Sequence, residues 1–252
     1  MLIQCAMNGG RSRTENPAVP ITPQELAPSA KGAVAAGAGT LHFHVRSPNG
    51  RESVSPDDVA AAVSAVRRAV PSTPFGVSTG SWIVPDPALR HQLVSEWRVL
   101  PNYASAIFKE EGSVELAKML LSRGVGIEVG LFDAEGAEIL ARSGLAPKCL
   151  RVLIEPREPT TAAALETVRA IEDALDRGGV KLPRLLHGLD ATCWALIDAA
   201  IARGYDTRVG FEDIVTLPDG SPAPSNAALV AEASRRRASR HLASPAPNNL
   251  GS

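Results

Sequence analysis

The chain has 252 residues, 44% of them apolar and 21% charged, which is enough for one large hydrophobic core or two modest ones. This length and composition exclude a disordered tail and a disulfide-rich miniprotein. The 26 Lys and Arg nearly balance the 27 Asp and Glu and leave a formal net charge of -1, so the totals indicate no nucleic-acid partner.

Two features bear on the cellular compartment. The three cysteines, Cys5, Cys149 and Cys193, are odd in number and far apart, which is typical of reduced thiols and not of a disulfide framework. The amino terminus lacks the basic flank and the length of a signal peptide, and no apolar run reaches the roughly 20 residues that cross a bilayer. We therefore expect a cytoplasmic protein without a membrane partner.

Eight times along the chain, a short apolar or β-branched run is followed by a longer stretch with helical spacing. The predicted strands are residues 2–7, 40–45, 74–78, 104–108, 126–129, 150–154, 184–187 and 207–210. Two of the helices between them begin with capping signals, at Thr22-Pro23-Gln24-Glu25 and at Ser55-Pro56-Asp57-Asp58. Two later helices are predicted to end at Arg123-Gly124 and Arg203-Gly204.

This element count decides the fold class. Eight strand-helix units in about 240 residues match a (β/α)8 barrel, whereas a doubly wound sheet usually has fewer strands and a Gly-rich phosphate turn. The Gly-containing turns at 8–10 and 79–81 lack the spacing of dinucleotide- or triphosphate-binding loops. We predict a single-domain α/β TIM barrel over residues 1–240 and a flexible tail over 241–252, which is rich in Ser, Pro and Asn.

The second predicted strand ends with an unusual polar face, at the end of the barrel where catalytic groups lie. Because successive side chains in a strand point to opposite faces, His42, His44 and Arg46 share one face. Two imidazoles about 6–7 Å apart along the backbone can bind one divalent ion, and neutral ring nitrogens are good ligands for Zn²⁺. This pairing favours metal binding over two unrelated structural histidines.

A third ligand is predicted after the eighth strand, where Arg208, Gly210 and Glu212 share a face and Asp213 follows. In a closed barrel only the first strand separates the eighth from the second, so Glu212 can reach an ion bound by the histidine pair. A His2Glu set with an open position is an established catalytic zinc shell. Taken alone, the two carboxylates would also fit an ordinary first helical turn.

Further polar residues lie at other strand ends. The segment Ser78-Thr79-Gly80-Ser81 offers hydroxyls and amides to a carboxylate or an oxyanion, although an ordinary turn has the same composition. Glu128 points into the barrel, where an acid needs a cation, and we expect Arg208 to be that cation. His187, at the end of the seventh strand, could line the pocket or be structural.

Short motifs along nearly the whole chain resemble one enzyme family. They include Asn8-Gly9-Gly10, the HxHxR block at 42–46, the segment Gly126-Ile127-Glu128-Val129-Gly130, the RxGxED block at 208–213 and Leu217-Pro218-Asp219-Gly220. In this order they are similar to the β-keto acid cleavage enzymes, typified by 3-keto-5-aminohexanoate cleavage enzyme. The HxHxR and RxGxED blocks together are specific, whereas either alone would be weak.

The resemblance implies a zinc-dependent (β/α)8 acyltransferase, often a homotetramer, that converts a β-keto acid and acetyl-CoA into acetoacetate and a new acyl-CoA. It implies that Zn²⁺ is bound by His42, His44 and Glu212. It further implies an acid/base relay formed by Asp213, Arg208 and Glu128. The predicted substrate-binding residues are Ser78, Thr79, Ser105, Arg11 and Arg46.

Three departures from the family pattern affect the expected substrate. Arg11 stands where typical members carry a Glu that is linked to recognition of a substrate amine. Its permanent charge indicates an anionic or dicarboxylic substrate, or a phosphate of CoA. Ser81 replaces an expected Gly, and Ile107 replaces an Asn that is common in the family, so we expect a drier and smaller pocket on that side.

Two other functions fit part of these observations. A metal-dependent TIM-barrel hydrolase would also use an HxH pair and a carboxylate, but such enzymes usually add histidines on middle strands, and the fourth to sixth predicted strands have none. A metabolite-binding barrel without activity would need a broken relay, yet Arg208, Glu128 and Asp213 are all present.

Overall fold

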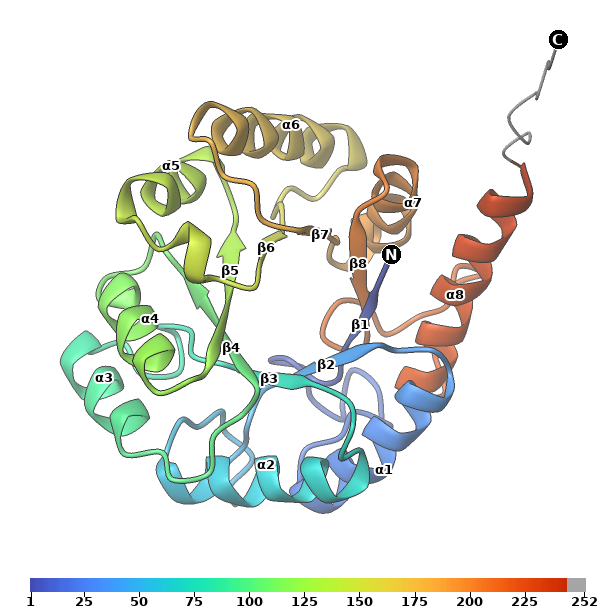
Figure 1. The fold of residues 1–252 in the computed structure, drawn as a ribbon. Helices are drawn as coiled ribbons and strands as arrows, with labels where there is room; N and C mark the ends of the chain where they lie inside the picture. Colours follow the sequence, from blue (N-terminus) through green and yellow to red (C-terminus); the bar gives the residue numbers. More distant parts are fainter. Residues whose placement is uncertain (244–252) are drawn as a thin grey trace, which may run out of the picture.

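The computed structural model describes residues 1–243 and has the predicted architecture, a closed barrel of eight parallel strands in sequence order surrounded by helices (Figure 1). The strands are β1 (Ile3–Ala6), β2 (Thr40–Phe43), β3 (Phe75–Ser78), β4 (Tyr103–Ile107), β5 (Gly126–Leu131), β6 (Arg151–Ile154), β7 (Arg184–Leu186) and β8 (Asp206–Val209). The helices are α1 (Pro23–Ala35), α2 (Pro56–Ala69), α3 (Pro87–Ser95), α4 (Ser113–Ser122), α5 (Ala134–Ser143), α6 (Thr161–Arg177), α7 (Cys193–Arg203) and α8 (Asn226–Ala243). Two short 3₁₀ helices, Ala146–Lys148 and Asp190–Thr192, precede β6 and α7.

Local signals position these elements as the sequence predicted. All eight strands lie within two residues of their expected boundaries. Glu25 accepts a hydrogen bond from the backbone of Thr22 (2.9 Å) at the start of α1, and Ser55 accepts one from Asp58 (3.3 Å) at the start of α2. At the end of α7, Gly204 has a φ of 70°, a left-handed conformation that favours glycine.

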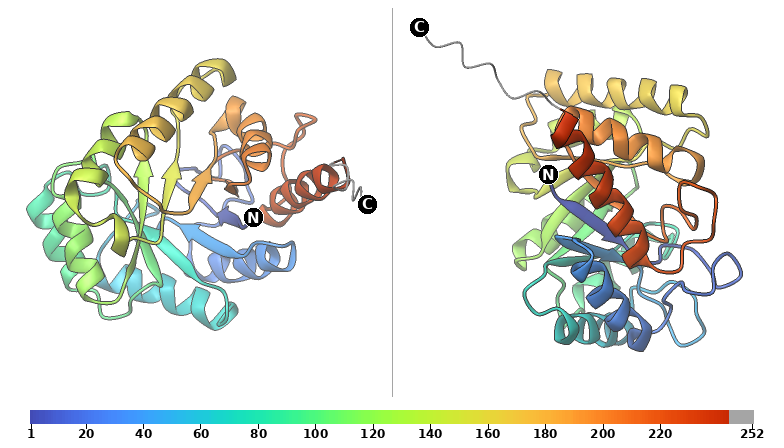
Figure 2. Two further views of the ribbon diagram at one scale, coloured as in Figure 1. Left: turned by 45° about the horizontal axis from the view of Figure 1, so that its top comes forward. Right: turned by 90° about the vertical axis from the view of Figure 1, so that its right-hand side faces the viewer.

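The last helix closes the ring of helices. Figure 2 shows α8 beside the amino-terminal strand, and it packs against α1, α7 and β1. Because α8 extends to Ala243, the first residues of the predicted tail are helical, while 244–252 lie outside the described residues. Among the helices of residues 1–243, none combines the length and the apolar composition that a membrane-spanning segment needs.

A buried polar network fills the barrel near the amino-terminal ends of the strands. Gln4 donates hydrogen bonds to the hydroxyl of Tyr103 and to Oε1 of Glu128, both at 2.9 Å. Nε of Arg151 contacts the same Glu128 oxygen at 2.6 Å. Burial raises the pKa of Glu128, but the Arg151 charge outweighs this effect and keeps that pKa below its ordinary value.

The expected pairing of Glu128 with Arg208 is therefore wrong. Glu128 on β5 lies in register with Arg151 on the neighbouring strand β6, whereas Arg208 on β8 is three strands away. Adjacent strands bring side chains of one face within reach, so the nearer arginine neutralises the acid. Arg208 instead pairs with the carboxylates that follow β8.

The end of β8 approaches β1 so closely that only glycine fits there. A Cβ on Gly210 would lie 2.0 Å from the carbonyl oxygen of Ala6, which is backbone and cannot rotate away. We expect Gly210→Ala to lower the free energy of unfolding by about 3 kcal/mol or more, measured by chemical denaturation. The matched control is Gly32→Ala in α1, where the new Cβ would make an ordinary 3.5 Å contact with Ala227. An unchanged stability of Gly210→Ala would contradict this close approach.

Candidate active site

Three side chains form a compact cluster of metal-binding type at the carboxyl ends of the strands. The predicted ligand atoms of His42, His44 and Glu212 all lie within 4.8 Å of one another. Nε2 of His42 is 3.6 Å from Oε2 of Glu212, and Nε2 of His44 is 3.4 Å from Oε1 of the same carboxylate. The three groups thus converge as the spacing along the sequence predicted.

The barrel topology explains this convergence. Strand β1 pairs with β2 on one side and with β8 on the other, so residues far apart in the chain flank the same strand. Gly9, just after β1, has a φ of 50°, and a Cβ there would lie 2.2 Å from Cγ of Glu212. The glycine of this loop therefore leaves the space that the Glu212 side chain occupies.

Two observations indicate that the cluster fits a metal ion. Oε2 of Glu212 is buried and has no hydrogen-bond partner among the described residues, a costly arrangement for a carboxylate. Burial lowers the pKa of His42 to about 4, so its ring is neutral near pH 7, as a metal ligand must be. Two imidazoles and one carboxylate are the donor set of catalytic zinc sites.

A second carboxylate holds the outer side of His44. Nδ1 of His44 contacts Oε1 of Glu52, and that oxygen also accepts a hydrogen bond from the Trp82 indole (3.1 Å). Trp82 stacks on the His44 ring, with centroids 6.0 Å apart. Burial alone would lower the pKa of His44, but Glu212 and Glu52 outweigh it and raise the pKa to about 9, so a metal ion that binds this ring would displace its proton. A carboxylate behind a ligand histidine fixes the ring and strengthens its donor atom.

We expect Glu52→Gln to weaken metal binding about 10–100-fold while the fold is retained, because His44 keeps its ring but loses the charge that orients it. The measurement is a metal titration of the purified protein, with circular dichroism to check the fold. Glu138→Gln, at an exposed position on α5, is the matched control. An affinity equal to that of the unmodified protein would show that Glu52 does not support the cluster.

Arg208 links the cluster to a second buried group. Its Nη2 lies 2.8 Å from Oε1 of Glu212 and 2.7 Å from Oδ1 of Asp213. His187 is completely buried, with Nδ1 3.4 Å from Oδ1 of Asp213 and Nε2 3.2 Å from Oε2 of Glu155. His187 does not line the cavity, so the structural alternative applies: its buried ring joins Asp213 to Glu155, which follows β6.

The cluster opens into a cavity of about 490 Å³. Of the predicted site residues, those that line it are Arg11, His42, His44, Ser78, Ser105, Arg208 and Glu212. Ile107 and Leu153 form an apolar part of the wall, as expected from Ile107 in place of a polar residue. Glu128 and Asp213 are fully buried and do not line the cavity, so Asp213 lies behind Arg208 and not beside it.

The Arg11 guanidinium at this cavity is already paired with acids. It contacts Oε1 of Glu15 at 2.9 Å and Oδ1 of Asp190 at 2.5 Å, and its Nε donates to the backbone carbonyl of Glu212 (3.3 Å). Burial lowers the pKa of Arg11, and the two carboxylates outweigh this effect. An anionic group of a substrate would therefore compete with two carboxylates for Arg11.

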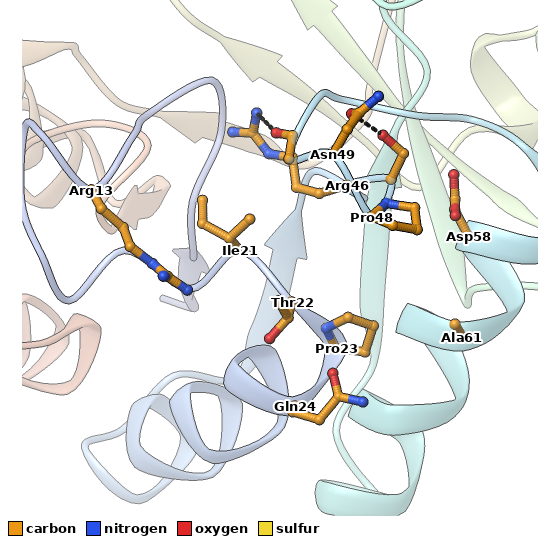
Figure 3. Close-up of a pocket in the computed structure, with 12 residues that line it drawn as sticks. Arg13, Ile21, Thr22, Pro23, Gln24, Arg46, Pro48, Asn49, Asp58 and Ala61 are labelled. Atoms are coloured by element: carbon orange, nitrogen blue, oxygen red, sulfur yellow. Dashed lines mark hydrogen bonds between the residues drawn. The ribbon is translucent and has the colours of Figure 1, made fainter.

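Two predicted substrate residues do not line this cavity. The Arg46 guanidinium donates to the carbonyls of Gly9 and Arg11, so it holds the loop after β1. Thr79 donates from Oγ1 to the carbonyl of Ser105 (2.7 Å) and thereby joins β3 to β4. Arg46 lines a separate cavity of about 630 Å³ between the loop after β2 and the first turns of α1 and α2 (Figure 3).

Sequence reasoning missed several residues of the site, and two different reasons apply. Glu155 and Arg157 follow directly after β6, so the rule that places functional groups at strand ends could have found them. Glu52 lies in the loop after β2 and returns to His44 because its backbone pairs with that of Arg46. The sequence contains no periodic pattern from which this contact between Glu52 and His44 could be predicted.

Comparison with known proteins gives one family over nearly the whole chain. The family model described as beta-keto acid cleavage enzyme matches residues 1–248. A 3-keto-5-aminohexanoate cleavage enzyme from Fusobacterium nucleatum is 28% identical over 97% of this chain and 94% of its own. A 3-oxoadipate:acetyl-CoA acetyltransferase from Cupriavidus necator is 27% identical over 92% of this chain and 86% of its own.

Solved structures agree on the fold. Apo ObcA superimposes with a TM-score of 0.66 at 20% identity, and its ternary complex with a C4-CoA adduct and oxalate with a TM-score of 0.67 at 19% identity. Both matches cover 89% of this chain, which spans only 63% and 65% of those longer chains. At this identity the similarity concerns the barrel alone.

Proposed function

The chain belongs to the β-keto acid cleavage enzyme family, and from this premise we propose that it is a zinc-dependent acyltransferase with acetyl-CoA as co-substrate. The reaction converts R–CO–CH₂–COO⁻ and CH₃–CO–SCoA into CH₃–CO–CH₂–COO⁻ and R–CO–SCoA, so atoms balance without a further reactant. The observation that carries the proposal is the convergence of His42, His44 and Glu212 at the wall of a cavity. A hydrolase would need none of the thioester chemistry that the family implies.

The metal-binding role rests on the donor set and its support. His42, His44 and Glu212 would hold the ion, and Glu52 would orient His44 from behind. A zinc ion bound there supplies Lewis-acid polarisation of a substrate carbonyl. The buried, unpartnered oxygen of Glu212 supports this role, because a cation would satisfy it.

Proton transfer is the next requirement, because the carbon between the two carbonyl groups of the β-keto acid must lose a proton. We assign this step to the carboxylate of Asp213, whose charge Arg208 stabilises at 2.7 Å. Asp213 has no exposed surface in the substrate-free protein, and Arg208 lines the cavity in front of it. Because Asp213 does not line the cavity, a water molecule would carry the proton from the substrate to it, and Arg208 would orient the substrate carboxylate.

Two hydroxyl side chains complete the proposed substrate contacts. Ser78 and Ser105 lie in register on β3 and β4 and line the cavity between the metal-binding cluster and its apolar wall. Their hydroxyls would donate hydrogen bonds to carbonyl oxygens as negative charge develops there. Glu128 would support the relay only indirectly, because it contacts Arg151 and Gln4 in the barrel interior.

The test is a panel of β-keto acids of different length and charge, incubated with acetyl-CoA and followed by acetoacetate formation. Acetoacetate together with a new acyl-CoA, both lost after treatment with a metal chelator and restored by Zn²⁺, would support the proposal. Hydrolysis of esters or amides without acyl exchange would favour the hydrolase instead. Substrate binding without any turnover would favour a metabolite-binding barrel that has no enzymatic activity.

We also propose a cytoplasmic location and a homotetrameric assembly. Cys5, Cys149 and Cys193 are buried free thiols, which supports the reducing conditions of the cytoplasm. The family resemblance implies a homotetramer. Analytical ultracentrifugation at micromolar concentrations of the chain measures the oligomeric state.

A further inference from the structure

Among residues 1–243, three arginines line the cavity, and they differ in how their charges are balanced. Arg208 contacts two carboxylates, those of Glu212 and Asp213. Arg11 also contacts two, Glu15 and Asp190. Arg157 contacts a single one among the described residues, Oε1 of Glu155 at 2.6 Å, and Glu155 is shared with His187.

Arg157 is also the most accessible of the three. Its side chain is 48% exposed, against 20% for Arg11 and 2% for Arg208. The guanidinium lies over the ring of Phe132, with its central carbon 4.1 Å from the ring centroid. Stacking on an aromatic face fixes the plane of the guanidinium and leaves its edge available to a planar partner such as a carboxylate.

The position of Arg157 relative to the metal-binding cluster matters for the substrate. In the eight-stranded ring β6 lies opposite β2 (Figure 1). Arg157, which follows β6, therefore lines the cavity on the side of the ring away from the histidine pair. Between them the wall carries the apolar side chains of Ile107 and Leu153. A molecule with one end at the cluster would lay a hydrocarbon segment along this wall and bring its far end to Arg157.

We infer that Arg157, stacked on Phe132, binds the distal carboxylate of a dicarboxylic β-keto acid and so determines the substrate class of the enzyme. This inference rests on the proposed acyl exchange and goes beyond it by naming the end of the substrate that is recognised. The substrate's second carboxylate would give Arg157 the two acidic partners that Arg11 and Arg208 already have. Arg11, in contrast, serves to hold the loops that carry Glu15 and Asp190.

The test compares two substrates of equal length, 3-oxoadipate and 3-oxohexanoate, by the ratio of their kcat/KM values with acetyl-CoA. We expect the unmodified enzyme to favour the dicarboxylate, and Arg157→Gln to reduce the ratio about tenfold or more, mainly through the KM of the dicarboxylate. Arg157→Lys keeps the charge without the planar fork and should restore part of the ratio. Arg142→Gln, which removes an exposed arginine paired with Glu138, is the matched control and should leave the ratio unchanged.

The outcomes separate this inference from the proposed function. Acetoacetate formation with no preference for the dicarboxylate, or a ratio that Arg157→Gln leaves intact, would overturn the role of Arg157 while the acyl exchange stands. A ratio that falls in Arg11→Gln and not in Arg157→Gln would assign the carboxylate to Arg11. If neither substrate yields acetoacetate and neither protects the protein against thermal unfolding, both the inference and the proposed function fail for these acids.

Discussion

Replacing His44 with alanine should abolish metal binding and reduce turnover to the background rate, while the barrel remains folded. Two ligands are left in the cluster, and His42 with Glu212 cannot form the three-point attachment that a catalytic zinc site requires. His44 follows the end of β2, so its loss removes the contacts with Trp82 and Glu52 but leaves the apolar core of the barrel intact. We expect the metal content to fall from about one equivalent to nearly none, measured by mass spectrometry of the dialysed protein.

The control for this variant is His91→Ala. His91 lies on α3, away from the cavity, and its removal should leave both metal content and turnover unchanged. Circular dichroism and thermal melting of both variants show whether the fold is intact. A metal-free His44→Ala protein that retains full activity would refute the role of the ion in catalysis, and full metal content would refute the ligand assignment.

Replacing Asp213 with asparagine should have the opposite pattern, with metal retained and kcat reduced about 10²–10⁴-fold. Asparagine has nearly the shape of aspartate but cannot accept the proton, and Glu212 keeps its own contact with Arg208 at 2.8 Å. Measurement of kcat and of bound metal on the same preparation separates this effect from ligand loss.

Stability must be followed in parallel, because Asp213 is buried and its loss removes one of the two charged partners of Arg208. Breaking a buried pair commonly costs about 3–5 kcal/mol, so the assays belong well below the melting temperature of the variant. Asp219→Asn, in the exposed turn before α8, is the control with the same chemical change. A folded Asp213→Asn enzyme with an unchanged rate would exclude Asp213 as the base.

The architecture and the ligand cluster could be predicted from sequence for the same reason. Strand ends, capping boxes and the alternation of side chains in a strand are local properties, and the closed ring then brings β8 next to β1 and β2 without further information. The positions of His42, His44 and Glu212 follow from these rules alone. The predicted strand at 184–187 also placed His187 at the carboxyl end of the barrel.

Contacts between side chains of different strands were harder to predict. The partner of Glu128 depends on the register between β5 and β6, which the sequence pattern does not specify to one residue. Arg11 lines the cavity, but its pairing with Asp190 could not be predicted, because it depends on the loop after β7, in which Asp190 has a φ of 46°. Such pairings depend on how loops fold over the barrel, for which no periodic signal exists.

Because the cluster is built from β2 on one side of β1 and from β8 on the other, it exists only while the two ends of the barrel are joined. An ion held there would bind the closed barrel and not an opened one, so it would stabilise the contacts of β1 with β2 and β8. Metal loading should therefore slow hydrogen exchange at the amides of β1 more than at those of β5, on the far side of the ring. The metal-binding cluster would thus also stabilise the closed barrel.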